Sequence, residues 1–272
     1  MQSWQHLRFE RVSETGGEVG VITLNRPERL NALNPLLMEE LALLFEQLRG
    51  ESADLRVILL RGEGRAFCAG ADIQSDAFAE PGPGAVQRQV ELQQRCARII
   101  RAMRNCPQPI IALCQGPACG GGFSLALAAD VRIATPDARM NAAYLQVGLG
   151  GADMGSGYLL TRLVGHSVAS ALLLTGDFIG AERAREVGLV TEIAQLEDLY
   201  EAGLAFARRM LRNAPLALRL TKDALNLLVD CGSLDAGLAI EDRQQVLLLN
   251  THDHREGLRA FVERRPPEYH NV

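Results

Sequence analysis

The chain of 272 residues is poor in aromatic residues, which make up 5% of it, and it has no long apolar run. With 22% charged residues and a mean hydropathy of +0.01, its composition is that of a globular protein and excludes disordered, collagen-like and coiled-coil classes. Stretches such as Val57–Leu60 and Pro109–Cys114 end far short of the roughly 20 apolar residues that cross a membrane. The N-terminus lacks the cationic and then apolar order of a secretory signal. We therefore expect a cytoplasmic protein with no membrane partner.

Excess positive charge is also missing, because 28 Lys and Arg residues face 33 Asp and Glu residues and leave a net charge of −5. No basic run exceeds a pair, so a nucleic-acid partner is not expected. The six cysteines form no C-x-x-C pair and lie among apolar residues, which predicts reduced thiols. The five histidines show no metal spacing except His252 and His254, which we interpret as part of a solvated helix start. No metal site is predicted.

Strands and helices alternate over residues 1–195. Two strands are expected in 7–24, a helix from Pro35 to about Arg49, strands at 56–62 and 109–116, a long helix ending near Asn105 after a Gly/Pro-rich loop at 80–84, a helix from Gly120 to about Asp130, and strands at 131–136 and 138–141. This alternation predicts a mixed α/β core with parallel strand pairing. Helical periodicity alone follows in 196–212, 215–230, 234–249 and 252–264. We therefore divide the chain into a core, residues 1–195, and a helical region, residues 196–272.

Two glycine-rich segments, Gly62–Ile73 and Gly120–Gly122, each follow a predicted strand. Backbone N–H groups in such segments are partly free, and those of the second segment also lie at the positive end of a helix. Two loops at the ends of neighbouring strands can direct two N–H groups at one oxygen, which is what stabilises an enolate or a tetrahedral oxyanion. Each segment alone is typical of a tight turn, but together they indicate an oxyanion site.

Standard nucleotide-binding patterns are absent, because Gly148–Asp153 ends in Asp where G-x-G-x-x-G needs Gly, and no phosphate-binding loop motif occurs. Neither NAD nor ATP is predicted as a cofactor. The segment around Ser124 comes within one residue of the G-x-S-x-G nucleophile elbow, and Asp177 followed by His252 or His254 would complete the order of a serine hydrolase. This is a remote alternative, because such residues are frequent, the last Gly of the motif is missing, and we favour Ser124 as a small polar residue packed inside the first turns of a helix.

Asp153 lies in a Gly/Ala-rich segment directly before an apolar helix. Its position is typical of an N-cap, which is the structural interpretation that we favour for the residue taken alone. A carboxylate at a helix N-terminus can also carry protons between substrate atoms. The sequence pattern itself leaves both interpretations open.

Six motifs along almost the whole chain resemble the enoyl-CoA hydratase/isomerase, or crotonase, superfamily. They are Leu24–Leu33, Gly64–Ile73, Gly116–Gly122, Leu174–Asp177, Ala184–Val190 and His254–Pro266. The resemblance implies a spiral of β-β-α units with a C-terminal helical trimerisation region, assembled as a homotrimer or a dimer of trimers. It also implies an acyl-CoA thioester as the substrate and no separate cofactor.

The resemblance places the two amides of an oxyanion hole on Ala71 and Gly121, where each donor is worth roughly 3–4 kcal/mol in comparable sites. The remaining residues that it implies bind the acyl-CoA. They are Ala69, Asp72 and Ile73 beside Ala71, Arg26 and Arg29 near the CoA phosphates, and Arg265 in a basic tail that reaches a CoA of the same or a neighbouring subunit.

The chain departs from typical hydratases of this superfamily at two positions, where Ser124 and Tyr144 replace glutamates. Asp153 aligns with the aspartate of dienoyl-CoA isomerases and of 4-chlorobenzoyl-CoA dehalogenase, but Ala97 falls nearest the histidine of the dehalogenase. Hydration needs a base and an acid, whereas one carboxylate facing an enolate can move a proton between two carbons. We therefore favour an isomerase that uses Asp153 as its single base, with Tyr144 as an aromatic wall of the acyl pocket. A hydratase of the fatty-acid oxidation type and a non-catalytic acyl-CoA-binding protein remain as alternatives.

Overall fold

The structure, a computed structural model, describes residues 4–51, 54–75 and 84–272, so the loop predicted at 80–84 lies outside the described residues except for Gly84. Its main sheet has the order β1-β2-β3-β4-β6-β9, in which β1 and β2 are antiparallel and all other neighbours are parallel. The strands are β1 (Leu7–Glu14), β2 (Gly17–Leu24), β3 (Leu55–Gly62), β4 (Ile110–Cys114), β6 (Val131–Ala134) and β9 (Glu192–Ile193). The prediction of a mixed α/β core with parallel pairing is confirmed.

A second sheet pairs β5 (Pro117–Cys119) in parallel with β7 (Arg139–Asn141) and β7 in antiparallel with β8 (Ile179–Gly180). The segment predicted as one strand over 109–116 therefore ends at Cys114, and the chain changes sheets at Gly116, which adopts a φ of +54°. A β-carbon at Gly116 would lie 2.3 Å from the Arg65 carbonyl oxygen, so only glycine fits this crossing. In the chain, one glycine-rich segment, Gly62–Ile73, precedes Gly116, and the other, Gly120–Gly122, follows it.

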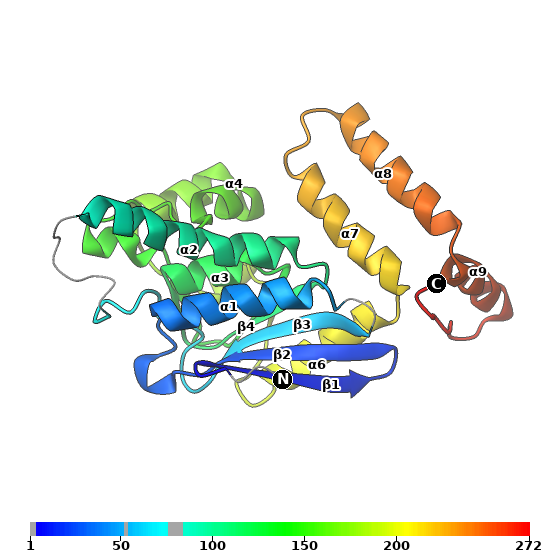
Figure 1. The fold of residues 1–272 in the computed structure, drawn as a ribbon, viewed down its shortest axis with the longest axis horizontal. Coiled ribbons are helices and arrows are strands. Elements are labelled where there is room, and N and C mark those ends of the chain that lie inside the picture. The colour runs from blue at the N-terminus through cyan, green and yellow to red at the C-terminus, as the bar shows by residue number, and fades with distance from the viewer. Residues whose placement is uncertain (1–3, 52–53, 76–83) are drawn as a thin grey trace.

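Helices cover both faces of the main sheet (Figure 1). On one face lie α1 (Pro35–Leu48), α2 (Ala85–Asn105), α3 (Gly121–Ala128) and α4 (Ser156–Thr175), and on the other lies α6 (Leu199–Leu211), while the short α5 (Ala181–Glu186) joins β8 to β9. Alternate residues of β3 serve the two layers, because Ile58 and Leu60 pack in the core with α1 whereas Val57 and Leu59 pack with α6. The apolar run that predicted a strand covered on both faces is thus explained.

The helix predicted after Asn34 begins as its capping pattern indicates. The Asn34 side chain accepts a hydrogen bond of 2.9 Å from the Leu37 N–H, and Pro35 occupies the first turn. Together they place the start of α1 beneath the loop that carries Leu33, which becomes a neighbour of the functional site.

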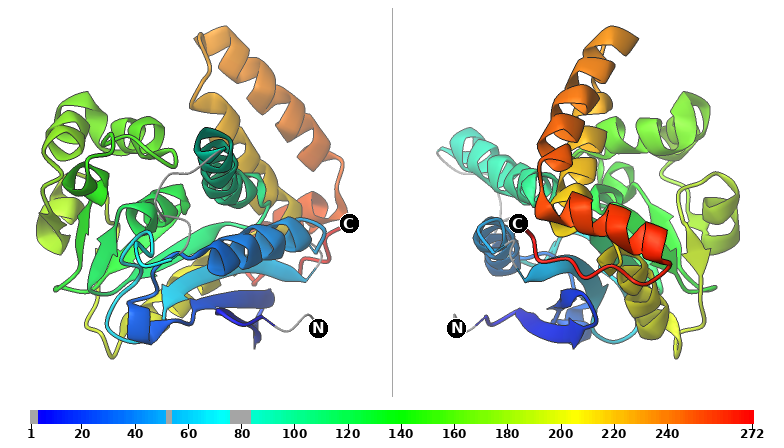
Figure 2. Two further views of the ribbon diagram at one scale, coloured as in Figure 1. Left: turned by 60° about the vertical axis from the view of Figure 1, so that its left-hand side comes forward. Right: turned by 90° about the vertical axis from the view of Figure 1, so that its right-hand side faces the viewer.

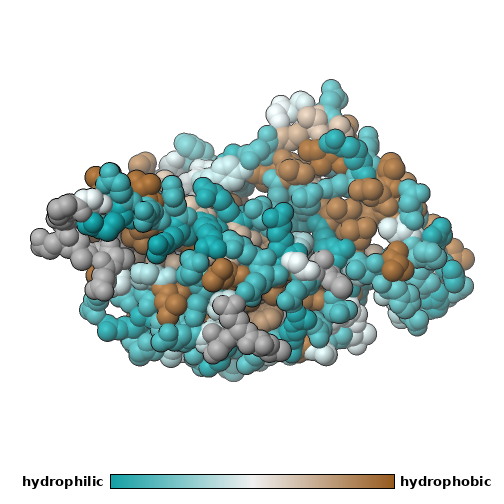
Figure 3. Space-filling model, in the orientation of Figure 1, coloured by the Kyte–Doolittle hydropathy of each residue, from teal (hydrophilic) through white to brown (hydrophobic). Residues whose placement is uncertain are grey.

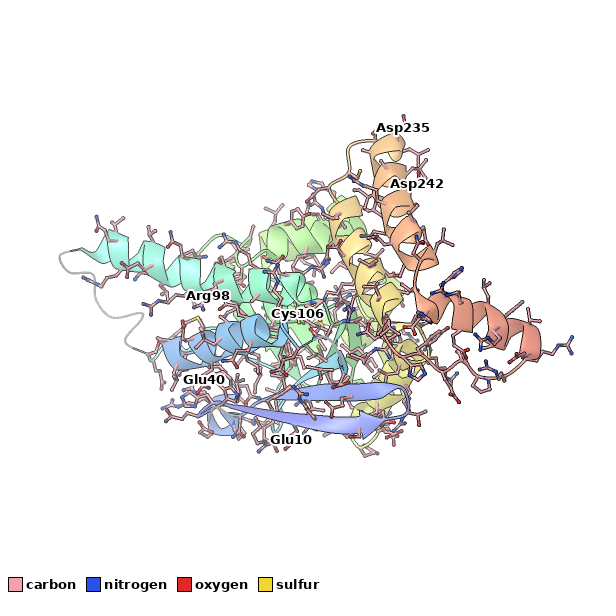
Figure 4. The ribbon with its side chains drawn as sticks, turned by 45° about the vertical axis from the view of Figure 1, so that its right-hand side comes forward. Glu10, Glu40, Arg98, Cys106, Asp235 and Asp242 are labelled. Carbon is pink, nitrogen blue, oxygen red and sulfur yellow. The ribbon has the colours of Figure 1, made fainter. Side chains whose placement is uncertain are left out.

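The last three helices project from the core as a separate arm: α7 (Pro215–Leu228), α8 (Leu234–Leu249) and α9 (His252–Glu263) (Figures 1 and 2). Asp235 and Asp242 on α8 lie at the far end of this arm (Figure 4). The predicted division at residue 195 stays a prediction about domains. By packing, α6 belongs with the core, because Leu204 and Leu211 are buried against the sheet.

Apolar side chains gather on the surface of the arm (Figure 3). They are Leu225 and Leu227 on α7, Leu234, Leu238, Val246, Leu247 and Leu249 on α8, and Leu258, Phe261 and Val262 on α9. Phe261 and Val262 are 85% and 80% exposed in the single chain. An apolar surface of this extent is typical of a protein interface.

One described helix, α4, is long and apolar enough by composition to span a membrane. It is broken at Gly165, whose φ of 77° and ψ of 163° are not helical. Each half is shorter than the roughly 20 residues that a bilayer requires, and the break would leave backbone groups unpaired in lipid. The absence of a membrane span stays a prediction.

Candidate active site

The two glycine-rich segments are joined by backbone hydrogen bonds. The Cys68 N–H donates to the Pro117 carbonyl at 3.2 Å, and the Cys119 N–H donates to the Cys68 carbonyl at 3.0 Å. A β-carbon at Gly122 would lie 2.1 Å from the same Cys68 oxygen, so α3 can begin here only with glycine. This contact brings the first turn of α3 against the loop that follows β3.

Ala71 and Gly121 present their N–H groups from these joined segments. Leu33 N–H donates to the Gly70 carbonyl at 2.7 Å and Asp72 N–H donates to the Leu33 carbonyl at 3.0 Å, which leaves the intervening Ala71 N–H outside this bridge. Gly121 is the first residue of α3, where an N–H has no partner within the helix. Neither N–H donates to an acceptor among the residues that the structure describes.

The two N–H groups lie close together, because a β-carbon at Gly70 would be 3.6 Å from the Gly121 nitrogen. The site therefore offers two unpaired donors, one of them at the positive end of α3. This is the arrangement that can hold an oxygen on which negative charge develops. Their role toward a substrate stays a prediction.

Arg26 holds the Ala71 loop in place from the buried side of the loop. Its guanidinium is 2.8 Å from the Asp72 carboxylate, and it also donates to the Ala32 carbonyl. The hydrogen bond from Arg26 holds the pKa of Asp72 below its ordinary value, so this carboxylate is committed to an ion pair. Arg26 is 8% exposed and turned inward, which favours a structural role over the contact with CoA phosphates that its motif implies.

The neighbouring CoA candidates lie nearer to solvent. Arg29, in the 3-10 turn η1 (Pro27–Arg29), is exposed and hydrogen-bonded to Gln74. Ile73 is 65% exposed and Ala69 is partly buried. Arg29, Ile73 and Ala69 therefore border the open side of the Ala71 loop, and their contact with CoA stays a prediction.

Arg265 lies elsewhere, in the tail after α9. Its guanidinium is tied to Glu256 at 2.5 Å and to Glu263 at 2.6 Å, and these carboxylates raise its pKa. In the single chain α9 and α3 stand apart (Figures 1 and 2). Arg265 can therefore approach a bound CoA only in another copy of the chain or after the arm moves.

Asp153 does not cap α4, so the N-cap interpretation is wrong. The cap residue is Gly155, and the Asp153 Oδ1 atom instead accepts hydrogen bonds from the Met154 N–H at 2.7 Å and from the Gln93 side-chain amide on α2. Met154 adopts a φ of +46°, a left-handed conformation that costs a non-glycine residue about 1–2 kcal/mol. The backbone is bent here, and the bend turns the carboxylate toward α2.

Met154 also places Asp153 beside the two unpaired N–H groups. Its sulfur would be 3.2 Å from a β-carbon at Gly121, and the Leu33 side chain would be 2.8 Å from the same β-carbon. Met154 adjoins Asp153 in the chain, and the Asp153 carbonyl accepts a hydrogen bond from Ser124 of α3, so the backbone of Asp153 lies next to the first turn of α3. The sequence-predicted Ala71, Gly121 and Asp153 are thus brought together.

Ser124 and Tyr144 form a hydrogen-bonded pair at the same place. The Ser124 Oγ is 2.8 Å from the Tyr144 hydroxyl and donates to the Asp153 carbonyl at 3.1 Å. A carbonyl can only accept, so the Ser124 proton is committed there and the Tyr144 hydroxyl must donate to Ser124. Burial raises the pKa of Tyr144, which lies in η3 (Ala143–Val147) with its ring 3.6 Å from a β-carbon position at Gly120.

The remote hydrolase alternative finds no base. Ser124 is fully buried, and its hydrogen-bond partners among the described residues are the Tyr144 hydroxyl and the Asp153 carbonyl, with no histidine. His252 and His254 lie on α9, at the far end of the molecule from α3 (Figure 1). Over the described ranges no cluster of three metal-ligating side chains occurs, and all six cysteines are free thiols.

Gln93 is the functional-site residue that sequence reasoning missed. It lies 60 positions before Asp153 in a helix whose first half is exposed and polar. No spacing rule connects a glutamine of one helix to a loop before another helix, and the two come together because α2 and α4 both pack against α3. An exposed glutamine within a helix matches no functional motif, so nothing in the sequence marks Gln93 as a site residue.

A sizeable cavity among the described residues lies away from this site. It has a volume of about 1020 Å³ and is bounded by α2, α4 and α7, through residues that include Arg104, Tyr158 and Lys222. It opens where the arm leaves the core. We attribute it to the projection of α7 from the core and not to a substrate site, because it contains neither unpaired N–H group.

Known proteins resemble this chain along nearly its whole length. A family model described as enoyl-CoA hydratase/isomerase matches residues 14–271. A Rhodobacter capsulatus protein provisionally named an enoyl-CoA hydratase is 37% identical over 267 residues, which are 98% of each chain. The 1,2-epoxyphenylacetyl-CoA isomerase of Escherichia coli is 34% identical over 251 residues, covering 92% of this chain and 94% of that protein.

Solved structures agree with these relatives. A Streptomyces coelicolor protein provisionally named an enoyl-CoA hydratase superposes with a TM-score of 0.91 at 36% identity, covering 100% of this chain and 96% of the other. An enoyl-CoA hydratase from Bacillus anthracis also gives a TM-score of 0.91, at 32% identity over 98% of this chain and 100% of the other. The mixed α/β architecture is therefore that of the crotonase fold.

Proposed function

Because this chain belongs to the enoyl-CoA hydratase/isomerase family, we propose that it is an enoyl-CoA isomerase that moves a double bond in an acyl-CoA thioester with Asp153 as its single base. Family membership supports an enzyme of the hydratase/isomerase type. The choice of isomerisation rests on the site. A relative named as an isomerase, at 34% identity, is compatible with that choice.

The observation that carries the proposal is that the hydroxyl groups of Ser124 and Tyr144 both donate their protons to acceptors within the protein. Tyr144 donates to Ser124, and Ser124 donates to the backbone carbonyl of Asp153, where the series of hydrogen bonds ends. Neither hydroxyl is free to activate water or to protonate a carbon. Asp72 is tied to Arg26, so Asp153 is the available carboxylate beside Ala71 and Gly121 among the described residues.

In this mechanism the thioester oxygen of a 3-enoyl-CoA accepts hydrogen bonds from the Ala71 and Gly121 N–H groups. The Asp153 carboxylate removes a proton from C2, and the electron pair moves into a dienolate whose negative oxygen the two donors stabilise. The protonated Asp153 then returns the proton to C4. The double bond has moved from C3 to C2, no atom is gained or lost, and the carboxylate is restored.

The second candidate, hydration, needs one group to take a proton from water and another to protonate C2. With glutamates replaced by Ser124 and Tyr144, the site offers one carboxylate for both tasks. Burial raises the pKa of Tyr144 and so keeps the phenol protonated. These features support isomerisation over hydration and give Tyr144 the role of a wall beside the acyl group.

We also propose that the chain assembles with copies of itself through the arm, as a trimer or a dimer of trimers, and works in the cytoplasm without a separate cofactor. The exposed apolar side chains of α7, α8 and α9 support self-assembly. Assembly would also bring Arg265 of one subunit toward the CoA of another. Arg29 at the open side of the Ala71 loop is the CoA contact expected within one chain.

The proposal is tested by incubating the purified protein with a panel of 2-enoyl-, 3-enoyl- and dienoyl-CoA thioesters and separating the products by chromatography. We expect migration of the double bond in a 3-enoyl-CoA as the main reaction. Formation of 3-hydroxyacyl-CoA as the main product would instead favour the hydratase. Tight acyl-CoA binding without turnover on any member of the panel would favour the non-catalytic alternative.

A further inference from the structure

We propose that Gln93 is a positioning residue that locks one oxygen of Asp153 and leaves the other as the single proton-transfer atom. This inference rests on the proposed function and names a determinant that neither the family motifs nor the sequence assigns. It begins from the unequal surroundings of the two carboxylate oxygens. Oδ1 accepts from the Gln93 amide and from the Met154 N–H, whereas Oδ2 accepts from no donor among the described residues.

Two donors on one oxygen fix the rotation of the Asp153 carboxylate about its Cβ–Cγ bond. The Met154 N–H comes from the adjacent peptide, so it holds Oδ1 near the backbone but allows the group to swing. Gln93 reaches the same oxygen from a separate helix and removes that freedom. The lone pairs of Oδ1 are then occupied, and proton transfer is directed to Oδ2.

The backbone of Asp153 is held as firmly as its side chain. Its N–H donates to the Ser156 Oγ at 3.0 Å, and its carbonyl accepts from the Ser156 N–H at 2.9 Å and from the Ser124 Oγ at 3.1 Å. With the main chain restrained, the carboxylate torsions are the remaining source of misalignment. Gln93 is the contact that restrains them from outside the loop.

The helix that carries Gln93 is itself anchored just beyond this residue. Arg98 on α2 reaches α1 (Figure 4), where it is 2.9 Å from the Glu39 carboxylate and 2.7 Å from that of Glu46. The sulfur of Cys96 is 3.4 Å from that of Met38 on α1. These contacts keep the third turn of α2 in place, so the amide of Gln93 has a fixed origin from which to reach Asp153.

The test compares Gln93→Met, which keeps the length of the side chain and removes its donor, with Gln94→Met at the next, exposed position of α2. On the 3-enoyl-CoA that the wild type turns over best, Gln93→Met should lower kcat by about 10- to 100-fold while KM changes by less than about twofold. Gln94→Met should match the wild type. Gln93→Lys, which restores a donor, should recover turnover relative to Gln93→Met.

Five results would overturn the inference, and they separate it from the proposed function. Equal kcat in Gln93→Met and wild type, with Asp153→Asn inactive, rejects the role of Gln93 and leaves Asp153 as the base. Equal losses in Gln93→Met and Gln94→Met show a disturbed helix, and a raised KM with unchanged kcat shows a binding role. Double-bond migration that is missing in the wild type, or that survives in Asp153→Asn, rejects the proposed function together with the inference.

Discussion

The polar side chains Arg26, Asp72, Ser124 and Tyr144 are hydrogen-bonded to protein atoms, and this pairing explains the chemistry that we propose. Arg26 neutralises Asp72 and holds the loop of Ala71. Ser124 donates a hydrogen bond to the backbone carbonyl of Asp153 and accepts one from the Tyr144 hydroxyl. Because these groups are paired with protein atoms, the mechanism that we propose leaves two backbone donors and the Asp153 carboxylate to act on the substrate.

Tyr144→Phe tests whether the phenol is structural. The variant removes the hydrogen bond to Ser124, but Ser124 can still donate to the Asp153 carbonyl, so the loop should persist. We expect a loss of about 1 kcal/mol in the free energy of unfolding, measured by urea denaturation, and a kcat within about threefold of the wild type. A kcat lowered by more than about 100-fold at unchanged stability would instead make the phenol a catalytic acid.

At this scale the sequence predicts donors better than it predicts side-chain partners. Glycine-rich segments after strands indicated the two loops, because glycine marks backbone that side chains would obstruct, and the family resemblance then placed the donors on Ala71 and Gly121. The partner of Asp153 could not be predicted, since Gln93 is 60 positions away and reaches it through the packing of two helices. The N-cap interpretation failed for a local reason, the left-handed turn at Met154.

At the scale of elements, the joining of β3, β5 and α3 creates the pair of unpaired N–H groups that we propose as an oxyanion hole. The isolated bridge between Cys68 and Ala118 runs the Ala71 loop alongside β5, and α3 begins directly after that strand. Neither loop could hold its N–H in place alone, because each is irregular backbone. The contact between Gly122 and the Cys68 carbonyl sets their separation.

Gly122→Ala tests this contact. Its β-carbon would meet the Cys68 oxygen at 2.1 Å, so the loop must shift, and we expect a loss of about 2–3 kcal/mol in the free energy of unfolding together with a large loss of turnover. Gly180→Ala is the matched control, since nothing lies within 4 Å of its β-carbon and its φ is −80°. Chemical denaturation of both variants measures the difference. Comparable stabilities within about 0.5 kcal/mol would contradict the account of the loops.

The long elements were predictable, as were the short strands β6 and β7, but the two-residue strands were not. Apolar periodicity and capping residues marked α1 and the helices after residue 196, and uninterrupted apolar runs marked β3 and β4. The strands β8 and β9 have only two residues each, too few for any alternation to show. The separation of β5 from β4 was missed because it depends on the left-handed backbone at Gly116.

The whole molecule consists of a core that carries the site and an arm that carries unpaired apolar surface. Phe261 is 85% exposed in the single chain. Burying such a side chain in an interface lowers the free energy, because apolar surface is removed from water. Helical periodicity predicted the arm, but not its direction, because nothing local to α7 indicates that it leaves the core. The placement of α6 against the sheet was likewise beyond the sequence, since its periodicity is that of any amphipathic helix.

Phe261→Glu tests assembly through the arm. A buried carboxylate opposes association, so we expect the variant to sediment as a smaller species than the wild type in analytical ultracentrifugation. Leu196→Glu, at a position that is 60% exposed between β9 and α6, should sediment like the wild type. Identical sedimentation of all three proteins would show that α9 takes no part in the interface.

The most direct test of the central claim is the turnover of a 3-enoyl-CoA in heavy water by the wild type and by Asp153→Asn. The account predicts that double-bond migration falls by about 10³-fold or more in the variant, because the amide cannot accept the substrate proton, while acyl-CoA binding and the assembly state are retained. Migration at the wild-type rate in Asp153→Asn would contradict the single-carboxylate mechanism.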